Sequence, residues 1–85
     1  MFYVYVLQSQ KDRKLYTGYS SDLKRRITEH NQGLVSSTKN RRPLKLIYYQ
    51  AFVSEIDARR EEKHLKSGSK ARNELKLRIT ESLTR

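Results

Sequence analysis

The 85-residue sequence contains no cysteine, and it has one proline, three glycines and only nine acidic residues. Without cysteine, neither a disulfide framework nor a thiolate metal site can form. No apolar run approaches the roughly 18 residues of a membrane span. The opening MFYVYVL also lacks the charged region and cleavage site of a secretion signal. We therefore expect a single domain over residues 1–85 that is cytoplasmic and does not bind membranes.

Basic residues dominate what is present. Nineteen Lys and Arg against nine Asp and Glu give a net charge of +10. The excess is uneven, with a net +7 on residues 1–50 and +3 on residues 51–85. A small domain with this field attracts polyanions at the cost of self-repulsion. The charge therefore favours a nucleic-acid partner, and solubility or another anionic surface is the less specific explanation.

The first half of the sequence predicts a hairpin followed by a helix. Bulky side chains alternate through FYVYVL, a polar SQKDR follows, and KLYTGY makes a second strand, so residues 2–19 form a β-hairpin with a five-residue loop. Both sets of alternating side chains in FYVYVL are bulky, which predicts a strand covered on both faces. Ser21 or Asp22 can cap a helix that runs to about Gln32, and Gly33 can end it in a left-handed conformation.

The second half predicts one strand and two helices. A basic loop ends at Pro43, and LKLIYYQAFV then predicts a third strand that is apolar on both faces. Ser54 resembles the start of a capping box and begins a helix that stops near Gly68. Ser69 can cap a last helix, whose apolar stripe consists of Ala71, Leu75, Ile79 and Leu83. These elements predict an α+β fold with a three-stranded, mainly antiparallel sheet flanked by three helices.

Glu62 is a candidate for chemistry because its predicted helix places it in an apolar stripe. Ala58, Glu62 and Leu65 are spaced i, i+4, i+7 and lie on one helix face. A carboxylate in such a stripe is costly unless it is paired or binds a metal. The spacing leaves both possibilities open, because Lys66 lies four residues further on and can form an ordinary ion pair.

Arg26 and His30 lie four residues apart and project together from the first predicted helix. Each also has an ordinary explanation. Arg26 belongs to a basic LKRR stretch that is typical of a solvated face. His30 lies in the last turn, where an imidazole can bond a terminal carbonyl and interact favourably with the helix dipole.

Two strand positions suggest a ligand groove. Tyr3 and Tyr5 share one face of the first strand, and Tyr16 and Gly18 share one face of the second. Tyrosines on strands are ordinarily core residues. A glycine inside a strand, however, usually marks a bulge or a place where another group approaches the backbone closely. Gly18 also precedes the helix that carries Arg26, which favours a groove at this point.

Taken together, these residues resemble the GIY-YIG nuclease domain over residues 2 to about 78. The two motif tripeptides are YVY at residues 3–5 and YTG at residues 16–18, where Tyr3 replaces glycine and Thr17 replaces isoleucine. The resemblance is closest to small free-standing bacterial members, through YTGYSSDLKRRITEHNQG, RRPLKLIYY and ARREEKHLKSGS. The ordered set of motif residues is the specific part of this resemblance.

The resemblance implies a catalytic set that consists of Tyr5, Tyr16, Arg26, His30 and Glu62. Glu62 would be the metal ligand, for Mg²⁺ or Mn²⁺, and Arg26 would clamp the phosphate. Tyr16 is the candidate general base, although His30, which titrates nearer neutrality, is an open alternative. Some members have a lysine where this sequence has Tyr19, so no role of that lysine carries over.

Six further positions are predicted to contact nucleic acid without reading bases: Gly18, Lys24, Arg25, Lys39, Arg41 and Arg42. A solvated surface is the ordinary explanation for each basic residue alone.

The sequence thus predicts a metal-dependent DNA endonuclease, with a place in DNA repair or recombination. It is expected to recognise DNA structure rather than sequence, because 85 residues leave little surface for reading a long site. RNA as a substrate and a protein partner stay open. The alternative is a non-catalytic nucleic-acid-binding module with the same fold. A third possibility is an interaction protein without nucleic acid, for which the charge would be incidental.

Overall fold

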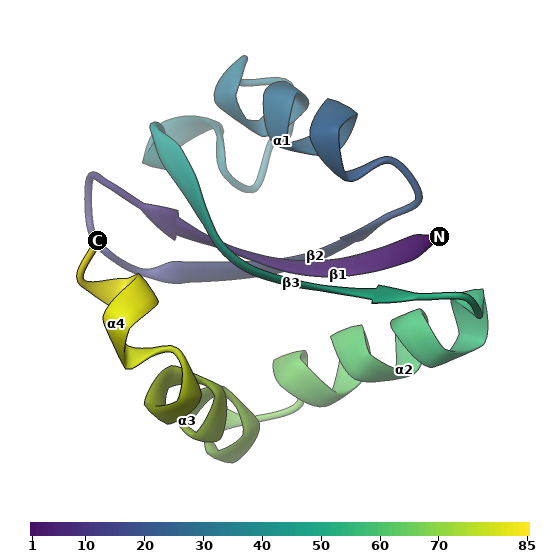
Figure 1. Ribbon diagram of the computed structural model, residues 1–85. Helices are drawn as coiled ribbons and strands as arrows, with labels where there is room; N and C mark the ends of the chain where they lie inside the picture. Colours follow the sequence, from purple (N-terminus) through teal and green to yellow (C-terminus); the bar gives the residue numbers. More distant parts are fainter.

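A computed structural model describes all 85 residues and shows a sheet between two layers of helices (Figure 1). The chain order is β1 (Phe2–Ser9), β2 (Leu15–Ser20), α1 (Leu23–Asn31), a 3-10 turn (Lys39–Arg41), β3 (Leu44–Phe52), α2 (Glu55–Lys66), α3 (Ser69–Arg78) and α4 (Thr80–Leu83). The predicted α+β fold and β-hairpin are confirmed.

The sheet has the order β2-β1-β3, and both strand pairs are antiparallel. The central strand is therefore β1, which pairs with the hairpin partner on one side and with β3 on the other. In this register Tyr5 lies opposite Gly18 on β2 and opposite Tyr49 on β3. An irregularity between Val6 and Leu7 shifts the β1–β3 pairing by one residue.

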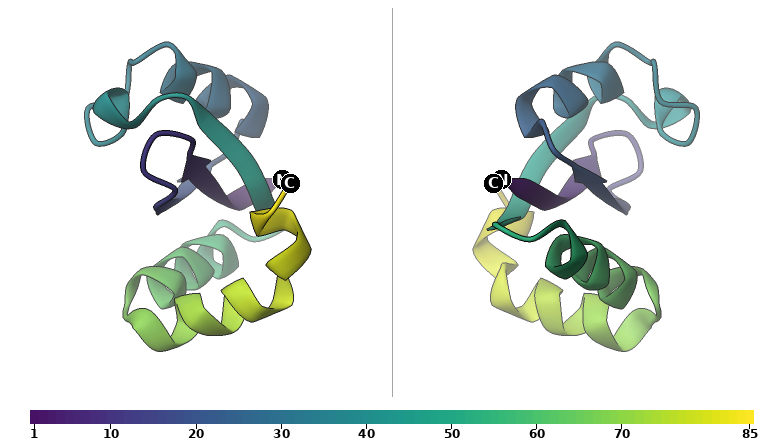
Figure 2. Two further views of the ribbon diagram at one scale, coloured as in Figure 1. Left: turned by 90° about the vertical axis from the view of Figure 1, so that its left-hand side faces the viewer. Right: turned by 90° about the vertical axis from the view of Figure 1, so that its right-hand side faces the viewer.

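Helices cover both faces of β1, as its sequence predicts. Helix α1 lies over one face, and α2, α3 and α4 lie over the other (Figures 1 and 2). Val4 and Val6 pack toward the α2 and α3 side, whereas Tyr5 and Leu7 belong to a separate apolar cluster with residues of α1. Strict alternation along one strand thus supplies two small cores.

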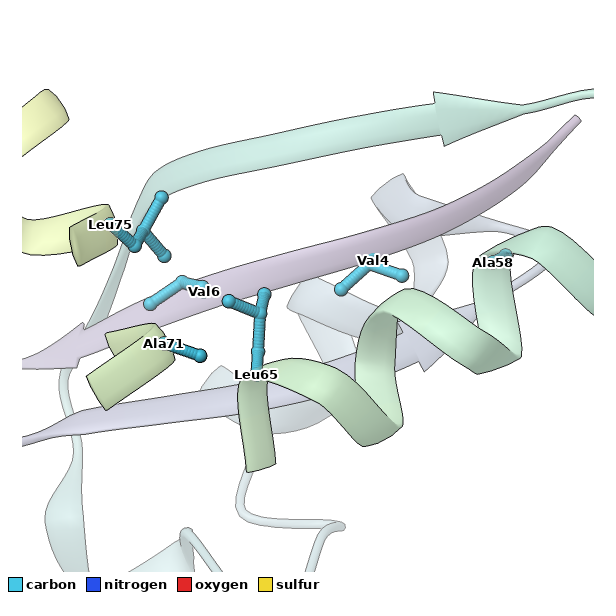
Figure 3. Packing of buried hydrophobic residues seen from close by; sticks show 6 residues of the cluster. All are labelled: Val4, Val6, Ala58, Leu65, Ala71 and Leu75. Carbon is cyan, nitrogen blue, oxygen red and sulfur yellow. The ribbon is translucent and has the colours of Figure 1, made fainter. Parts of the chain in front are cut away.

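The larger core joins β1 to α2 and α3 (Figure 3). Its six buried members are Val4, Val6, Ala58, Leu65, Ala71 and Leu75. The predicted stripes of both C-terminal helices thus supply four of these residues. Leu65 is 2% exposed and reaches from α2 toward β1 and α3.

The predicted helix ends are mostly confirmed. Asp22 caps α1 by accepting a hydrogen bond from the backbone N–H of Arg25, and Gly33 follows the helix with φ 78°. Ser54 caps α2 through the N–H of Asp57. Side chains with a hydroxyl or carboxylate satisfy amide groups that have no partner in the first helical turn.

The last predicted helix differs from the expectation. Its N-cap is Gly68 rather than Ser69, and no side chain bonds there. It also breaks at Ile79 (φ −117°, ψ 30°), so that α4 is a separate short helix. Two β-branched residues in succession disfavour a helix, and the Thr80 hydroxyl donates to the carbonyls of Lys76 and Leu77 at the break.

Substitution of Leu65 by alanine tests the main core. Leu65→Ala is expected to lower the free energy of unfolding by about 2–5 kcal/mol, because it leaves a cavity between sheet and helices. Leu77→Ala is the matched control, since Leu77 is 79% exposed on α3 and its loss is expected to cost less than about 0.5 kcal/mol. Urea denaturation followed by circular dichroism measures both, and equal losses would contradict this packing.

Candidate active site

A buried hydrogen-bonded chain of three side chains lies at the centre of the candidate site. Tyr5 on β1 is 1% exposed, and its hydroxyl lies 2.8 Å from Nε2 of His30 on α1. The other ring nitrogen of His30, Nδ1, lies 2.8 Å from Oγ1 of Thr38. With the imidazole proton on Nδ1, Tyr5 donates to Nε2 and Thr38 donates to the carbonyl of Val35, at 3.5 Å. Every polar atom of the chain then has a partner.

His30 is neutral at physiological pH. It has no exposed surface, and burial lowers its pKa to about 4, an effect to which the charge of Arg26 adds and which Glu29 opposes. Both ring nitrogens bind side chains, so the expected bond to a terminal carbonyl of α1 and the expected charged interaction with the helix dipole are wrong. His30 therefore has no surface open to solvent, and its two ring nitrogens hold Tyr5 and Thr38.

The Tyr5 phenol keeps its proton. Burial raises the pKa of Tyr5 to about 12, the nearby Tyr16 and Glu62 raise it as well, and Arg26 opposes the rise. Tyr5 thus joins β1 to α1 through a hydroxyl that stays a donor.

Gly18 provides the space for the Tyr5 ring. A Cβ atom at this position would lie 2.4 Å from both Cζ and the hydroxyl oxygen of Tyr5. The predicted close approach to Gly18 therefore exists, but the approaching group is Tyr5 rather than a ligand. Gly18 is itself buried, so its backbone does not line an open groove.

Tyr16 is the more accessible of the two motif tyrosines. It is half-buried, and its ring meets that of His30 edge to face with 5.1 Å between centroids. The Nζ atom of Lys66 lies 6.0 Å from the Tyr16 ring centroid. The Tyr16 ring thus packs against the neutral imidazole of His30 and has the ammonium of Lys66 nearby.

Arg26 lies one turn before His30 and is partly open to solvent. Its side chain is 38% exposed and forms an ion pair with Glu29 at 3.2 Å. Arg26 and His30 belong to the same helix, and the charge of this guanidinium lowers the pKa values of both Tyr5 and His30. An exposed fork of donors beside a buried neutral pair is suited to bind an anion from solvent.

Glu62 is both partly buried and paired. Its side chain is 18% exposed, and its carboxylate accepts a hydrogen bond from Lys66 at 2.8 Å. The buried neighbours Ala58 and Leu65 confirm that it lies in the apolar stripe of α2. Both features expected from the spacing, burial in the stripe and the i, i+4 pair, therefore occur together.

The donor chemistry of Glu62 suits a hard divalent cation. No three acidic, histidine or cysteine side chains gather anywhere in the chain, so a cation here would have fewer than three such ligands from the protein. Mg²⁺ is commonly held by one or two carboxylates, with water and substrate phosphate as further ligands. Glu62 is therefore compatible with Mg²⁺ or Mn²⁺, provided that Lys66 yields its place.

Arg41, one of the residues predicted to contact nucleic acid, is engaged in the fold. Its Nε lies 3.6 Å from a carboxylate oxygen of Asp12, and its guanidinium donates to the carbonyl of Leu15 at 3.5 Å. Only 24% of its side chain is exposed. Arg41 thus fastens the loop before β3 to the start of β2, a role that its basic surroundings in the sequence conceal.

The other predicted basic contacts lie at the surface. Four of them are exposed: Lys24, Arg25, Lys39 and Arg42. The guanidinium of Arg42 also lies against Gly33. Arg42 also donates to the carbonyl of Lys39 at 2.8 Å. These four side chains carry charge on the α1 side of the sheet, where Arg26 also lies.

Sequence reasoning missed two residues of the site. Thr38 is fully buried and fixes His30, but it lies in a loop whose only visible pattern is basic. Lys66 was predicted only as an ion-pair partner, and its proximity to Tyr16 depends on how α2 packs against β2. In the sequence, the i, i+4 spacing from Glu62 is the one feature that indicates Lys66, and no feature indicates Thr38.

Tyr19 takes part in holding α2 to the sheet. Its hydroxyl donates to Glu55 at 2.8 Å, and the guanidinium of Arg59 lies 3.9 Å from its ring centroid. Phe2 stacks against the same ring, with 6.5 Å between centroids. The position therefore serves packing against α2.

Comparison with known proteins confirms the resemblance seen in the sequence. Residues 1–76 match the family model of the GIY-YIG catalytic domain. A UPF0213 protein of Staphylococcus haemolyticus is 42% identical over 80% of this chain and 83% of its own. A UPF0213 protein of Natronomonas pharaonis is 41% identical over 85% of each chain.

A solved structure shares the fold. The solution NMR structure of a UPF0213 protein from Bacillus halodurans aligns with a TM-score of 0.58 and 36% identity, covering 93% of this chain and 85% of that one.

None of the helices combines the length and the apolar character that a membrane span requires.

Substitution of Gly18 tests the packing of Tyr5. Gly18→Ala is expected to lower the free energy of unfolding by about 1–3 kcal/mol, because the new methyl group must displace a ring that is buried and hydrogen-bonded. Gly68→Ala is the matched control, since no atom lies within 4 Å of a Cβ there and its backbone is extended. Thermal melts of both variants measure the difference, and a harmless Gly18→Ala would contradict the close contact.

The low pKa of His30 makes stability depend on pH. The unfolded chain takes up a proton on this imidazole below about pH 6.5, whereas the folded protein does so only near pH 4. The contribution is therefore fully present above pH 6.5 and is lost as pH falls toward 4, with a slope of up to about 1.4 kcal/mol per pH unit.

Replacement of the imidazole removes this dependence. His30→Gln keeps a hydrogen-bonding side chain without the titration, so its free energy of unfolding is expected to change less between pH 6.5 and pH 4.5 than that of the native protein. Urea denaturation at a series of pH values measures the slopes. Identical slopes for the two proteins would mean that folding does not lower the pKa of His30.

Proposed function

The chain belongs to the GIY-YIG catalytic domain family, a family of nucleases, and we propose on this basis that it is a metal-dependent DNA endonuclease. The observation that carries the proposal is that side chains from four separate elements come together. Tyr5 of β1 and Tyr16 of β2 both contact His30 of α1, and Arg26 lies one turn before His30 on the same helix. Glu62 of α2 bonds the Lys66 ammonium, which lies 6.0 Å from the Tyr16 ring centroid.

Hydrolysis of a phosphodiester requires a positioned nucleophile and neutralised charge on the phosphoryl oxygens. Arg26 supplies the second requirement from the protein, because its exposed guanidinium can bind two phosphoryl oxygens at once. Its ion pair with Glu29 orients the side chain, which is partly open to solvent. A phosphate bound there is proposed to lie next to Tyr16.

Tyr16 is the proposed general base, which in its phenolate form would accept a proton from the attacking water. His30 is excluded from direct contact by its burial, and Tyr5 keeps its proton, so Tyr16 is the phenol that a water molecule can reach. The edge-to-face contact with His30 fixes the orientation of the Tyr16 ring. Tyr5 and His30 are then positioning residues: His30 packs against the Tyr16 ring, and Tyr5 holds His30 by a hydrogen bond.

Glu62 would hold the metal ion at the edge of this site. A bound Mg²⁺ or Mn²⁺ supplies Lewis-acid stabilisation of the phosphate and of the departing oxygen. Lys66, which occupies the carboxylate of Glu62, must move aside for the ion to bind. Its long side chain is 49% exposed, so this movement leaves the core undisturbed.

The proposed substrate is DNA recognised by its backbone. Lys24, Arg25, Lys39 and Arg42 are exposed cations that bind phosphates without reading bases. Recognition by the backbone suits a branched, nicked or otherwise irregular DNA, which is the kind of substrate that repair and recombination present.

Removal of Glu62 or Arg26 tests the chemistry. Glu62→Ala and Arg26→Ala are each expected to reduce cleavage by about 100-fold or more, because each deletes a charge that stabilises the transition state. Gel assays with branched, nicked, single-stranded and duplex DNA, and with RNA, in Mg²⁺ or Mn²⁺ measure the rates. DNA binding by anisotropy is expected to persist in both variants.

Neighbouring residues on α2 serve as matched controls for the loss of charge. Glu61→Ala removes a carboxylate next to Glu62 but about 100° around the helix. Arg60→Ala removes an exposed guanidinium paired with Asp57. Both are expected to cleave at the native rate. Cleavage by Glu62→Ala equal to that of the native protein would point to a contaminating nuclease or a wrong assignment.

A non-catalytic nucleic-acid-binding module is the second candidate function. The ion pair between Glu62 and Lys66 favours it, since this pair already neutralises the carboxylate without a metal. Under this alternative, no substrate is cut in either metal while binding stays strong and falls steeply with salt. Loss of salt dependence altogether would instead favour a protein-interaction role.

A further inference from the structure

A second group of cations lies outside the candidate active site. Arg13 and Lys14 from the β1–β2 turn and Arg72 and Lys76 from α3 line a hollow of about 490 Å³, together with Leu15. We name this feature the basic hollow. The turn and the C-terminal α4 lie at the same side of the molecule (left in Figure 1), and Leu83 of α4 also lines the hollow.

The four cations of the basic hollow have no acidic partners. None of them takes part in an ion pair, and no acidic residue lines the hollow. Asp12 belongs to the same turn, but its carboxylate is paired with Arg41 at 3.6 Å. Four like charges around one depression repel one another, and a bound anion removes that cost.

The turn is held rigidly in a conformation that an arginine adopts reluctantly. Arg13 has φ 64°, a left-handed conformation in which glycine is the unstrained residue. The side chain of Gln8, which is 6% exposed, donates to the Arg13 carbonyl at 3.3 Å, and the Arg13 N–H donates to Ser9 at 2.9 Å. These bonds fix the backbone from which the Arg13 side chain extends toward the hollow.

The opposite wall is equally well fixed. Arg72 and Lys76 lie four residues apart on α3 and project to the same side. Leu75, which lies between them in the sequence, and Ala71, which precedes Arg72, are both buried in the main core. Two anchored elements thus present four exposed cationic side chains to one depression, which matches the requirement for binding a phosphate group.

The basic hollow is next to the candidate active site along β2. Leu15 lines the hollow, and Tyr16 is the next residue of the same strand. Successive side chains of a strand point to opposite faces, so the hollow and Tyr16 lie on the two sides of one edge strand. A backbone that follows this edge can reach both.

We propose that the basic hollow binds a phosphate of the nucleic-acid backbone that flanks the phosphate to be cut. The inference rests on the nucleic-acid substrate of the proposed function but not on cleavage. It makes the β1–β2 turn and α3 a second contact region, separate from the basic residues on the α1 side. A nucleic acid bound at both places would lie along β2.

A pair of charge-matched variants on one helix tests the proposal. Arg72→Gln/Lys76→Gln removes two cations from the hollow, and Lys70→Gln/Arg78→Gln removes two exposed cations of α3 that do not line it. Both variants have the same net charge. Binding of a fluorescent DNA duplex, measured by anisotropy without metal over a range of KCl concentrations, gives the affinity and its salt dependence.

The hollow variant is expected to bind DNA about tenfold or more weakly than the control variant at low salt. Its slope of log K against log[KCl] is expected to be shallower by about one to two units, since each lost phosphate contact removes about one. Arg13→Gln is expected to act in the same direction. Equal affinities and slopes for the two double variants would overturn the proposal.

The outcomes separate this inference from the endonuclease proposal. If the native protein binds DNA with the expected difference between variants but cuts nothing, the basic hollow stands and the endonuclease proposal fails. If the native protein cuts DNA while the two variants bind alike, the reverse holds. NMR titration with inorganic phosphate distinguishes a small free anion as the occupant. Shifts of the Arg13 and Arg72 amides, together with equal DNA slopes, would reject the nucleic-acid backbone.

Discussion

The hydrogen bond between Tyr5 and His30 is the contact on which the site depends. It joins the central strand to α1 through two side chains that have almost no exposed surface, and it fits only because Gly18 leaves room for the ring. A charge on either partner would be costly at such depth. The pKa of Tyr5 is accordingly raised, so that the phenol keeps its proton, and the pKa of His30 is lowered, so that the imidazole stays neutral.

Because this pair is neutral and closed, the groups able to meet a substrate are arranged around it. Arg26 lies one turn before His30 on α1, and Glu62 on α2 bonds the Lys66 ammonium that lies 6.0 Å from the Tyr16 ring centroid. Tyr16 covers His30 with its ring edge and has a partly open surface. A cationic fork, a carboxylate and a phenol thus surround one inert support, which keeps their relative positions fixed.

Local patterns in the sequence predicted much of this molecule, whereas side-chain placement across elements could not be read from them. Alternation in β1, the caps at Asp22 and Ser54 and the Ala58–Leu65 stripe depend on neighbours within a few residues. The burial of His30 depends instead on Thr38 and Tyr5, and the engagement of Arg41 depends on Asp12. The break at Ile79 shows that α4 packs against β3 rather than extending an ideal stripe. The motif residues were placed together only by resemblance to a family.

The small size of the core makes the buried polar chain informative about function. Only 17 of 85 residues are buried, and His30 and Thr38 are among those with no exposed surface. A short chain gains stability mainly from apolar burial, so two polar side chains at such positions are a poor choice for stability alone. Apolar residues of similar volume would fill the same space without requiring matched hydrogen bonds. The polar chain is therefore best explained by what it holds in place, which is a tyrosine at the point where charges from two helices meet.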